Sequence, residues 1–223
     1  MDYNIILLGI FLVFLIYFLY GYFSVRGKTI ADKLTLKAGV VNTTISLKDL
    51  SDPTASNYFL SAWIYVKSKS AVEVDTIIAV GKKKIKLNLD TASKLTLVFN
   101  NNRTTQIIDN FPLQKWVYVI VSVDSNIVDF YIDGKLIRSL KHTATMPSII
   151  ATDQISCNIT SPSASEIYLA NFERFPFAID PTLAQSKYMS GNGANPLSNY
   201  FSSYEGSFTL TKDDLEVKKV SLF

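Results

Sequence analysis

The feature of this sequence that most constrains its fold is a series of short runs in which apolar and polar residues alternate. Alternation with a period of two is typical of a β-strand that buries one face. The runs are also rich in β-branched and aromatic residues, which strands favour. From residue 28 onward we expect strands at 58–66, 76–80, 84–89, 94–99, 104–109, 116–123, 128–132 and 166–172.

Turn residues separate these runs, at Gly81, 100–102, 124–126 and 133–134. Many short strands at close spacing are typical of a β-sandwich or a jelly roll. The chain has 223 residues, 48% of them apolar, which is enough for a single hydrophobic core. The sequence therefore predicts an all-β domain.

The segment DFYIDGKLI, residues 129–137, contains the clearest turn signal. Asp-Gly between two alternating runs favours a type I′ hairpin turn, because both central residues need a positive φ. Gly134 adopts a positive φ freely, and Asp133 tolerates it better than most residues. The alternative is a calcium site formed by Asp133 with Asp124 and Asp129, which would require several converging oxygen ligands. We predict the structural role and no metal site.

One short helix is predicted near 181–189. Asp180 followed by Pro181 is a helix start, because aspartate caps the first N–H groups and proline suits the first helical position. Gly191 is a suitable helix stop.

Residues 5–23 form an apolar run without a charged residue. At about 1.5 Å per residue, the run nearly matches a hydrocarbon core of about 30 Å. The alternative, a cleaved signal peptide, needs a basic start and a shorter apolar core, whereas this chain carries Asp2 and no basic residue there. The sequence therefore predicts one N-terminal transmembrane helix that enters the lipid bilayer through residues 5–23.

The flanking charges predict the orientation of this helix. Basic residues follow it at Arg26, Lys28, Lys33 and Lys37. By the positive-inside rule, the chain is then a single-pass membrane protein whose C-terminal domain faces the cytosol. Glycans on the sequons at Asn42, Asn102 and Asn158 would indicate the opposite orientation.

Five segments occur in a fixed order: FLSAWIYV, TIIAVG, LQKWVYVIVSVD, VDFYIDGKLI and EIYLANFERFPFAIDPTLAQSKY. This order resembles the laminin-G-like, concanavalin-A-like jelly-roll family over residues 55–190. The resemblance implies an all-β, concanavalin-A-like (laminin-G-like) jelly-roll sandwich. It also implies structural roles, in the core or in the hairpin turn, for Trp63, Trp116, Tyr131, Asp133 and Gly134.

Some relatives in that family hydrolyse glycans with an E-x-D-x-x-E strand, which this sequence lacks. Glu73, Glu166 and Glu173 form no close pair in the sequence, whereas a retaining glycosidase needs two carboxyl groups about 5 Å apart. One histidine, His142, and one cysteine, Cys157, argue against a catalytic triad and a zinc site. We therefore expect no enzymatic activity and no cofactor, and we interpret Cys157 as a small buried apolar side chain.

The densest charge is the run GKKKIK, residues 81–86. We interpret its lysines as a solvated hairpin tip or as a patch that contacts anionic lipid or an acidic protein surface. These lysines are Lys82, Lys83, Lys84 and Lys86. The net charge of +3 is too small to indicate binding to nucleic acid.

These patterns divide the chain into an anchor (1–26), a linker with the first strands (27–54), the jelly roll (55–190) and a C-terminal tail (191–223). The tail starts with loop composition and ends with the segment FTLTKDDLEVKKVSLF. We interpret this end as a terminal strand docked on the sandwich or as an arm that binds a partner.

Two functions fit these predictions. The first is a non-catalytic structural protein that tethers a membrane to a protein layer. Such chains resemble minor capsid or inner-membrane proteins of large icosahedral DNA viruses, which implies a virion location and capsid components as partners. The alternative is a surface glycan-binding or adhesion domain, with exposed aromatic residues from Tyr200 and Tyr204 or from Phe175 and Phe177.

Overall fold

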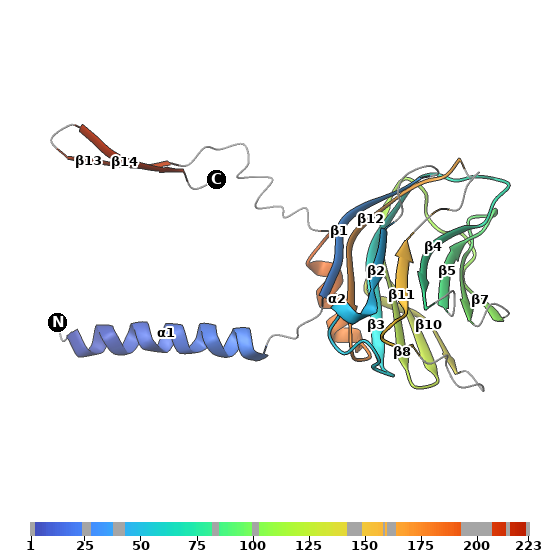
Figure 1. The fold of residues 1–223 in the computed structure, drawn as a ribbon, viewed down its shortest axis with the longest axis horizontal. Coiled ribbons are helices and arrows are strands. Elements are labelled where there is room, and N and C mark those ends of the chain that lie inside the picture. The colour runs from blue at the N-terminus through green and yellow to red at the C-terminus, as the bar shows by residue number, and fades with distance from the viewer. Residues whose placement is uncertain are drawn as a thin grey trace.

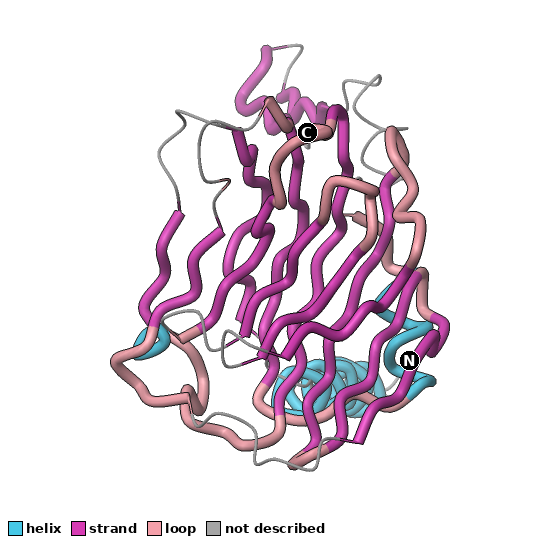
Figure 2. Tube along the Cα trace, turned by 90° about the vertical axis from the view of Figure 1, so that its right-hand side faces the viewer, coloured by secondary structure: helices cyan, strands magenta, loops and turns pink. Residues whose placement is uncertain are grey.

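The structure is a computed structural model of the chain. It describes residues 3–23, 28–37, 43–81, 85–99, 103–141, 149–157, 159, 164–192, 207–212 and 215–221. Strands dominate these residues, as the magenta segments in Figure 2 show. A short 3-10 helix, η1 (Leu47–Asp49), follows the second strand.

Two antiparallel sheets of six strands each face one another (Figure 1). Sheet A has the order β1 (Lys28–Lys37), β12 (Glu166–Phe175), β3 (Tyr58–Ser68), β8 (Trp116–Asp124), β9 (Ile127–Ile132) and β10 (Lys135–Lys141). Sheet B has the order β2 (Thr43–Ser46), β11 (Gln154–Cys157), β4 (Asp75–Val80), β5 (Ile85–Leu89), β6 (Leu95–Phe99) and β7 (Arg103–Ile108). The all-β jelly-roll sandwich expected from the sequence is thereby confirmed.

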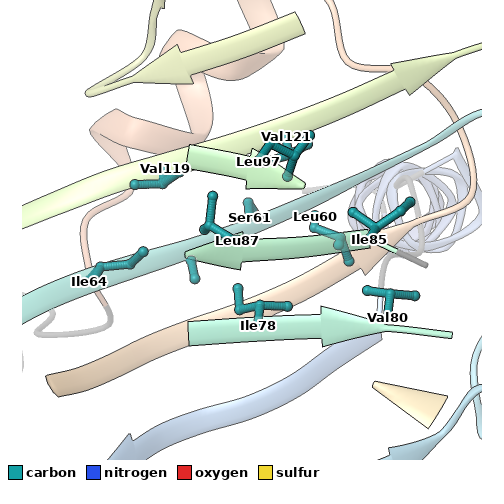
Figure 3. Close-up of a pocket in the computed structure, with 11 residues that line it drawn as sticks. Leu60, Ser61, Ile64, Ile78, Val80, Ile85, Leu87, Leu97, Val119 and Val121 are labelled. Carbon is teal, nitrogen blue, oxygen red and sulfur yellow. The ribbon is translucent and has the colours of Figure 1, made fainter. Parts of the chain in front are cut away.

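The main core lies between the two sheets, because each strand directs alternate side chains toward the facing sheet. In β3, for example, Leu60, Ala62 and Ile64 are buried in this core. Figure 3 shows a small void there, about 20 Å³ in volume, with Ile64 and Leu87 among the side chains that line it. That volume has room for about one water molecule, so this void is too small for a ligand.

The intervening side chains of β3 form a second cluster on the outer face of sheet A. Phe59 and Trp63 lie in this outer-face cluster, beside Tyr118 of β8 and Tyr131 of β9. Helix α2 (Pro181–Met189) packs on the cluster, and Figure 1 shows it on the sheet A side of the molecule. Trp63 and Tyr131 are therefore buried, at 8% and 2% exposed, under a helix rather than between the sheets.

Helix α2 begins at the residue pair that predicts it. The Asp180 carboxylate accepts a hydrogen bond of 2.9 Å from the backbone N–H of Leu183, and Pro181 is the first helical residue. Ala184 is fully buried against the outer-face cluster. The helix range agrees with the expectation of a short helix near 181–189.

The turn between β9 and β10 contacts α2. Asp133 and Gly134 have φ angles of 48° and 77°, and a type I′ turn requires positive values at both positions. A Cβ atom on Gly134 would lie 2.5 Å from Gln185 Oε1 and 3.1 Å from Gln185 Cα. Glycine is therefore needed at residue 134 for the turn and also for the close approach of the helix.

Helix α1 spans Tyr3–Phe23, and the structure describes its side chains from residue 7 to residue 19. The large apolar side chains in this stretch are exposed, from 42% at Leu19 to 76% at Tyr17. Among the described residues, no helix has the length and apolar character to cross a membrane. The transmembrane helix expected over residues 5–23 stays a prediction.

Beyond Asn192, the described part of the tail consists of β13 (Ser207–Lys212) and β14 (Leu215–Ser221). These strands pair antiparallel with each other and form a separate two-stranded sheet. A tail strand docked on the sandwich, one of the two interpretations of this segment, is therefore not found in these two ranges. The partner-binding arm stays a prediction.

Candidate functional site

Three aromatic side chains form a row across the outer face of sheet A. The strand register places Tyr168 of β12 opposite Tyr65 of β3, and Tyr65 opposite Trp116 of β8. On its other side, Tyr168 lies opposite Thr35 of the edge strand β1. Directly opposite residues of neighbouring strands share a face of the sheet. Tyr65, Trp116 and Tyr168, here called the aromatic row, therefore lie on one surface.

The rings of the aromatic row contact one another. The ring centroids of Tyr65 and Trp116 are 5.4 Å apart, and those of Tyr65 and Tyr168 are 6.1 Å apart. Helix α2 covers the neighbouring Trp63, on which the Tyr188 ring stacks at 5.6 Å. The three side chains of the row are half-buried, so part of each remains accessible. Mutual contacts between the rings hold the three side chains in one arrangement on this surface.

A hollow of about 430 Å³ opens beside the row, toward β1. It is lined by Lys33, Leu34, Thr35, Trp116, Tyr168, Leu169, Ala170 and Asn192. Its volume lies in the range of small-molecule sites. Its lining joins aromatic rings to ammonium, hydroxyl and amide groups, which can donate and accept hydrogen bonds.

The chain that follows α2 forms one wall of this hollow, at Asn192. The preceding carbonyl, of Gly191, accepts hydrogen bonds from Trp63 Nε1 at 3.0 Å and from Asn171 Nδ2 at 3.4 Å. Gly191 has a φ of 79°, which is common just after a helix and redirects the chain. The buried Trp63 thus fixes the segment that places Asn192 at the hollow.

Glu166 lies next to the aromatic row and is held by two neighbours. Its carboxylate accepts a hydrogen bond from the Tyr168 hydroxyl and forms an ion pair of 3.1 Å with Lys67. The hydrogen bond from Tyr168, followed by that from Lys67, lowers the pKa of Glu166. A glycosidase general acid needs a raised pKa, so the environment of Glu166 does not suit that role.

A buried ion pair joins the loop between β3 and β4 to the first residue of β4. Lys69 and Asp75 are 3.0 Å apart, with side chains 4% and 1% exposed. Lys69 Nζ also donates hydrogen bonds to the carbonyls of Ser70 (2.8 Å) and Glu73 (2.6 Å). Ser165 Oγ donates a hydrogen bond of 2.5 Å to Asp75. This network joins the loop to the start of β12 and has a structural role.

The aspartates considered for calcium do not form a metal site in the described structure. Asp133 Oδ1 accepts a hydrogen bond of 2.9 Å from the backbone N–H of Tyr118, which ties the turn to β8. Among the residues with described side chains, no three histidine, cysteine, aspartate or glutamate side chains are grouped so that they could hold a metal ion. Cys157 is buried in the main core, as expected, and burial raises its pKa to about 12.

Most of the remaining residues singled out in the sequence lie outside the described part of the structure. Lys86 is half-buried on β5, whereas Lys82, Lys83 and Lys84 lie outside the described residues. Tyr200 and Tyr204 also lie outside them, as do His142 and the three sequon asparagines.

Phe175 and Phe177, the two described residues among the aromatic residues proposed from the sequence for glycan binding, do not belong to the aromatic row. Phe175 is buried and its ring stacks on Phe59 at 4.5 Å. Phe177 packs on the same ring at 5.4 Å. Sequence reasoning missed Tyr65 and Tyr168. Each lies in an alternating run at a position that does not point into the inter-sheet core, but only the strand order shows that the two side chains are neighbours.

Two antiparallel six-stranded sheets with a helix on one outer face define a jelly-roll β-sandwich. A family model described as "Concanavalin A-like lectin/glucanases superfamily" matches residues 39–180. The chain therefore belongs to the concanavalin A-like lectin/glucanases superfamily, as the ordered segments of its sequence imply. A comparison with curated proteins found no match.

Solved structures with this fold include binding domains of botulinum neurotoxins. The serotype D binding domain has a TM-score of 0.60 and 16% identity over 75% of this chain. The binding domain of neurotoxin DC was solved with rat synaptotagmin II (TM-score 0.58, 15% identity over 74% of this chain) and with SialylT (TM-score 0.57, 16% identity over 74%). In each case this chain covers 45% of the solved chain, so it spans less than half of their length. At identities this low, the structural similarity shows a shared fold and nothing more.

Proposed function

We propose that this chain is a non-catalytic, lectin-like domain that binds a glycan over the aromatic row. The observation that carries the proposal is the hollow of about 430 Å³ beside Trp116 and Tyr168. Aromatic faces pack against the apolar faces of sugar rings, and hydroxyl, amide and ammonium groups bond to sugar hydroxyls. Thr35 and Asn192 supply such polar groups in the same hollow.

Two further observations support binding rather than hydrolysis. The family description names lectins beside glucanases, and the similar neurotoxin structures are binding domains, one of them in complex with SialylT. The carboxylate nearest to the row, that of Glu166, has a lowered pKa because Tyr168 and Lys67 hold it in its charged form. The surface at the aromatic row therefore suits the binding of a sugar. The adjacent Glu166 does not suit the donation of the proton that cleavage of a sugar requires.

A glycan array with the full chain in detergent micelles tests this proposal, followed by calorimetry on the ligand that binds best. We expect Trp116→Ala to weaken binding by about 10- to 100-fold, because losing an aromatic anchor costs about 1.5–3 kcal/mol. Trp116→Phe keeps a ring and should retain most of the affinity.

Ile150→Ala is the matched control, because Ile150 is 50% exposed and precedes β11 of sheet B. This variant should bind like the wild type. A wild-type chain that binds no glycan, or a Trp116→Ala variant with unchanged affinity, would contradict the proposal.

A second proposal concerns the N-terminal segment: α1 anchors the domain in a lipid bilayer, as residues 5–23 predict. In support, the large apolar side chains from Leu7 to Leu19 are 42–76% exposed along α1. Transfer of each large apolar side chain from water is worth about 1.5–3 kcal/mol. A helix with these side chains therefore favours a lipid environment.

Alkaline carbonate extraction of membranes that contain the full chain tests the anchor. The wild-type chain should remain in the membrane pellet, and Val13→Arg, which places a charge in the middle of α1, should shift it toward the soluble fraction. Recovery of the wild-type chain in the soluble fraction would contradict anchoring.

The two functions expected from the sequence place the domain on opposite sides of the membrane. A glycan-binding domain is expected on the non-cytosolic side, whereas the flanking basic residues predict the cytosolic side. Glycosidase-sensitive mass at Asn42, Asn102 or Asn158 would favour the first, and protease protection of an unglycosylated domain the second. The tether with capsid partners, and the viral setting, are supported by none of the comparisons.

A further inference from the structure

We propose that the glycan bound at the aromatic row is acidic, and that Lys33 binds its carboxylate or sulfate group. This inference rests on the proposed glycan-binding function. Lys33 lines the same hollow as Trp116 and Tyr168, and its side chain is exposed. A sugar that packs on these rings therefore places its substituents next to an ammonium group.

The position of Lys33 in the sheet leaves its charge without a partner among the described residues. Its directly opposite residue on β12 is Ala170, which is small and neutral. The ion pairs formed by the described residues do not include Lys33. Ala170 also lines the hollow, so the space next to the ammonium group is not filled by a large side chain.

The acidic side chains of β12 are engaged by other lysines. Lys67 binds Glu166 at 3.1 Å, and Lys187 binds Glu173 at 2.9 Å. Both carboxylates are thus neutralised by cations other than Lys33. An acidic group of a ligand would not compete with them for the Lys33 ammonium.

A second lysine extends the positive charge along β1. Lys37 is exposed and lies two positions beyond Thr35 on the edge strand. Lys37 lies directly opposite Glu166 of β12, whose carboxylate Lys67 already binds, so two lysines face this single carboxylate. Lys33 and Lys37 therefore flank the hydroxyl of Thr35 with two positive charges, an arrangement that favours an anionic sugar over a neutral one.

The test compares matched glycans that differ only in the charge of one group: lactose against sulfated lactose, and sialyllactose against its carboxamide, in which the carboxylate is replaced by a neutral amide. The full chain in detergent micelles should bind the acidic members about tenfold more tightly than their neutral counterparts. Lys33→Gln should remove this preference, measured as the ratio of the affinities for the acidic and neutral members, because the amide carries no charge but can still bond to a sugar hydroxyl. Raising sodium chloride from 50 to 500 mM should weaken only the acidic members, because salt screens exposed charges.

The outcomes separate this inference from the function on which it rests. Equal affinity for acidic and neutral members, or a Lys33→Gln variant that keeps the preference, would overturn the inference while glycan binding stands. Absence of binding to every glycan would overturn both. A preference for the sialylated over the sulfated member identifies the carboxylate as the recognised group, and the reverse order identifies the sulfate. Trp116→Ala should weaken all members alike, since the ring packs on the sugar whatever its charge.

Discussion

At the scale of single residues, the two tryptophans show that the outer face of sheet A is covered by α2 at one position and accessible at the next. Trp63 is covered, because the Tyr188 ring stacks on it and its Nε1 donates a hydrogen bond to the carbonyl of Gly191. Trp116 lies in the adjacent row and remains half-buried. Both residues match core positions of the family in the sequence, and the fold gives only one of them a covered environment.

Gly134→Ala should destabilise the domain by about 2–5 kcal/mol. Left-handed backbone costs a residue with a Cβ about 1–2 kcal/mol, and the clash with α2 adds about 1–3 kcal/mol. Gly191→Ala is the matched control: its φ is also positive, at 79°, but a Cβ there meets none of the described atoms within 4 Å. Urea unfolding should therefore show a clearly larger loss for Gly134→Ala, and equal losses would refute the steric account.

Lys69→Met should cost about 3–5 kcal/mol, because it leaves the charge of Asp75 buried without its partner. Adding Asp75→Asn should restore most of the loss, since an amide can still accept the Ser165 hydrogen bond without a buried charge. Lys67→Met breaks an exposed pair and should leave the unfolding midpoint nearly unchanged. The account of a buried pair fails if the Lys69 and Lys67 variants unfold at the same urea concentration.

At the scale of elements, α2 separates the covered part of the outer face from the accessible aromatic row. The helix is short, and its start depends on the Asp180 cap. Asp180→Ala should lower the thermal midpoint and speed hydrogen exchange in α2, and Asp180→Asn, whose amide oxygen can still cap the helix but carries no charge, should show smaller changes in both. Equal exchange in both variants would show that the cap does not hold the helix.

The same cap predicts a pH dependence. The hydrogen bond from Thr182, followed by that from the Leu183 N–H, lowers the pKa of Asp180 below its ordinary value of 3.8. The folded state therefore favours the charged carboxylate, and this contribution is complete above pH 3.8 and is lost as the pH falls further. The thermal midpoints of the wild type and Asp180→Ala should thus converge in acid. A constant difference across this range would contradict the prediction.

The elements themselves were largely predictable, because alternation, turn residues and capping act over a few neighbouring residues. The Asp133-Gly134 turn and the helix after Asp180 are examples. The aromatic row was not predictable, because it joins strands far apart in the chain: β12 inserts between β1 and β3, and β8 follows β3. That order is fixed by the packing of the two sheets, which no local pattern encodes.

At the scale of the whole molecule, the packed core and the accessible hollow lie on different faces of sheet A. Its inter-sheet core contains a void of about 20 Å³ and offers no room for a ligand, whereas the outer face of sheet A carries a hollow of about 430 Å³. Helix α1 adds an exposed apolar segment at the N-terminal end. The function that we propose from these features is that of a glycan-binding domain held at a membrane.

The most direct test of glycan binding at the aromatic row uses the fact that the chain has two tryptophans. Fluorine NMR of the full chain labelled with 5-fluorotryptophan gives one resonance for Trp63 and one for Trp116, assigned with Trp116→Phe. On titration with the glycan that binds best, the account predicts a saturable shift of the Trp116 resonance and little change at Trp63, which α2 covers. A shift at Trp63 alone, or binding that moves neither resonance, would contradict it.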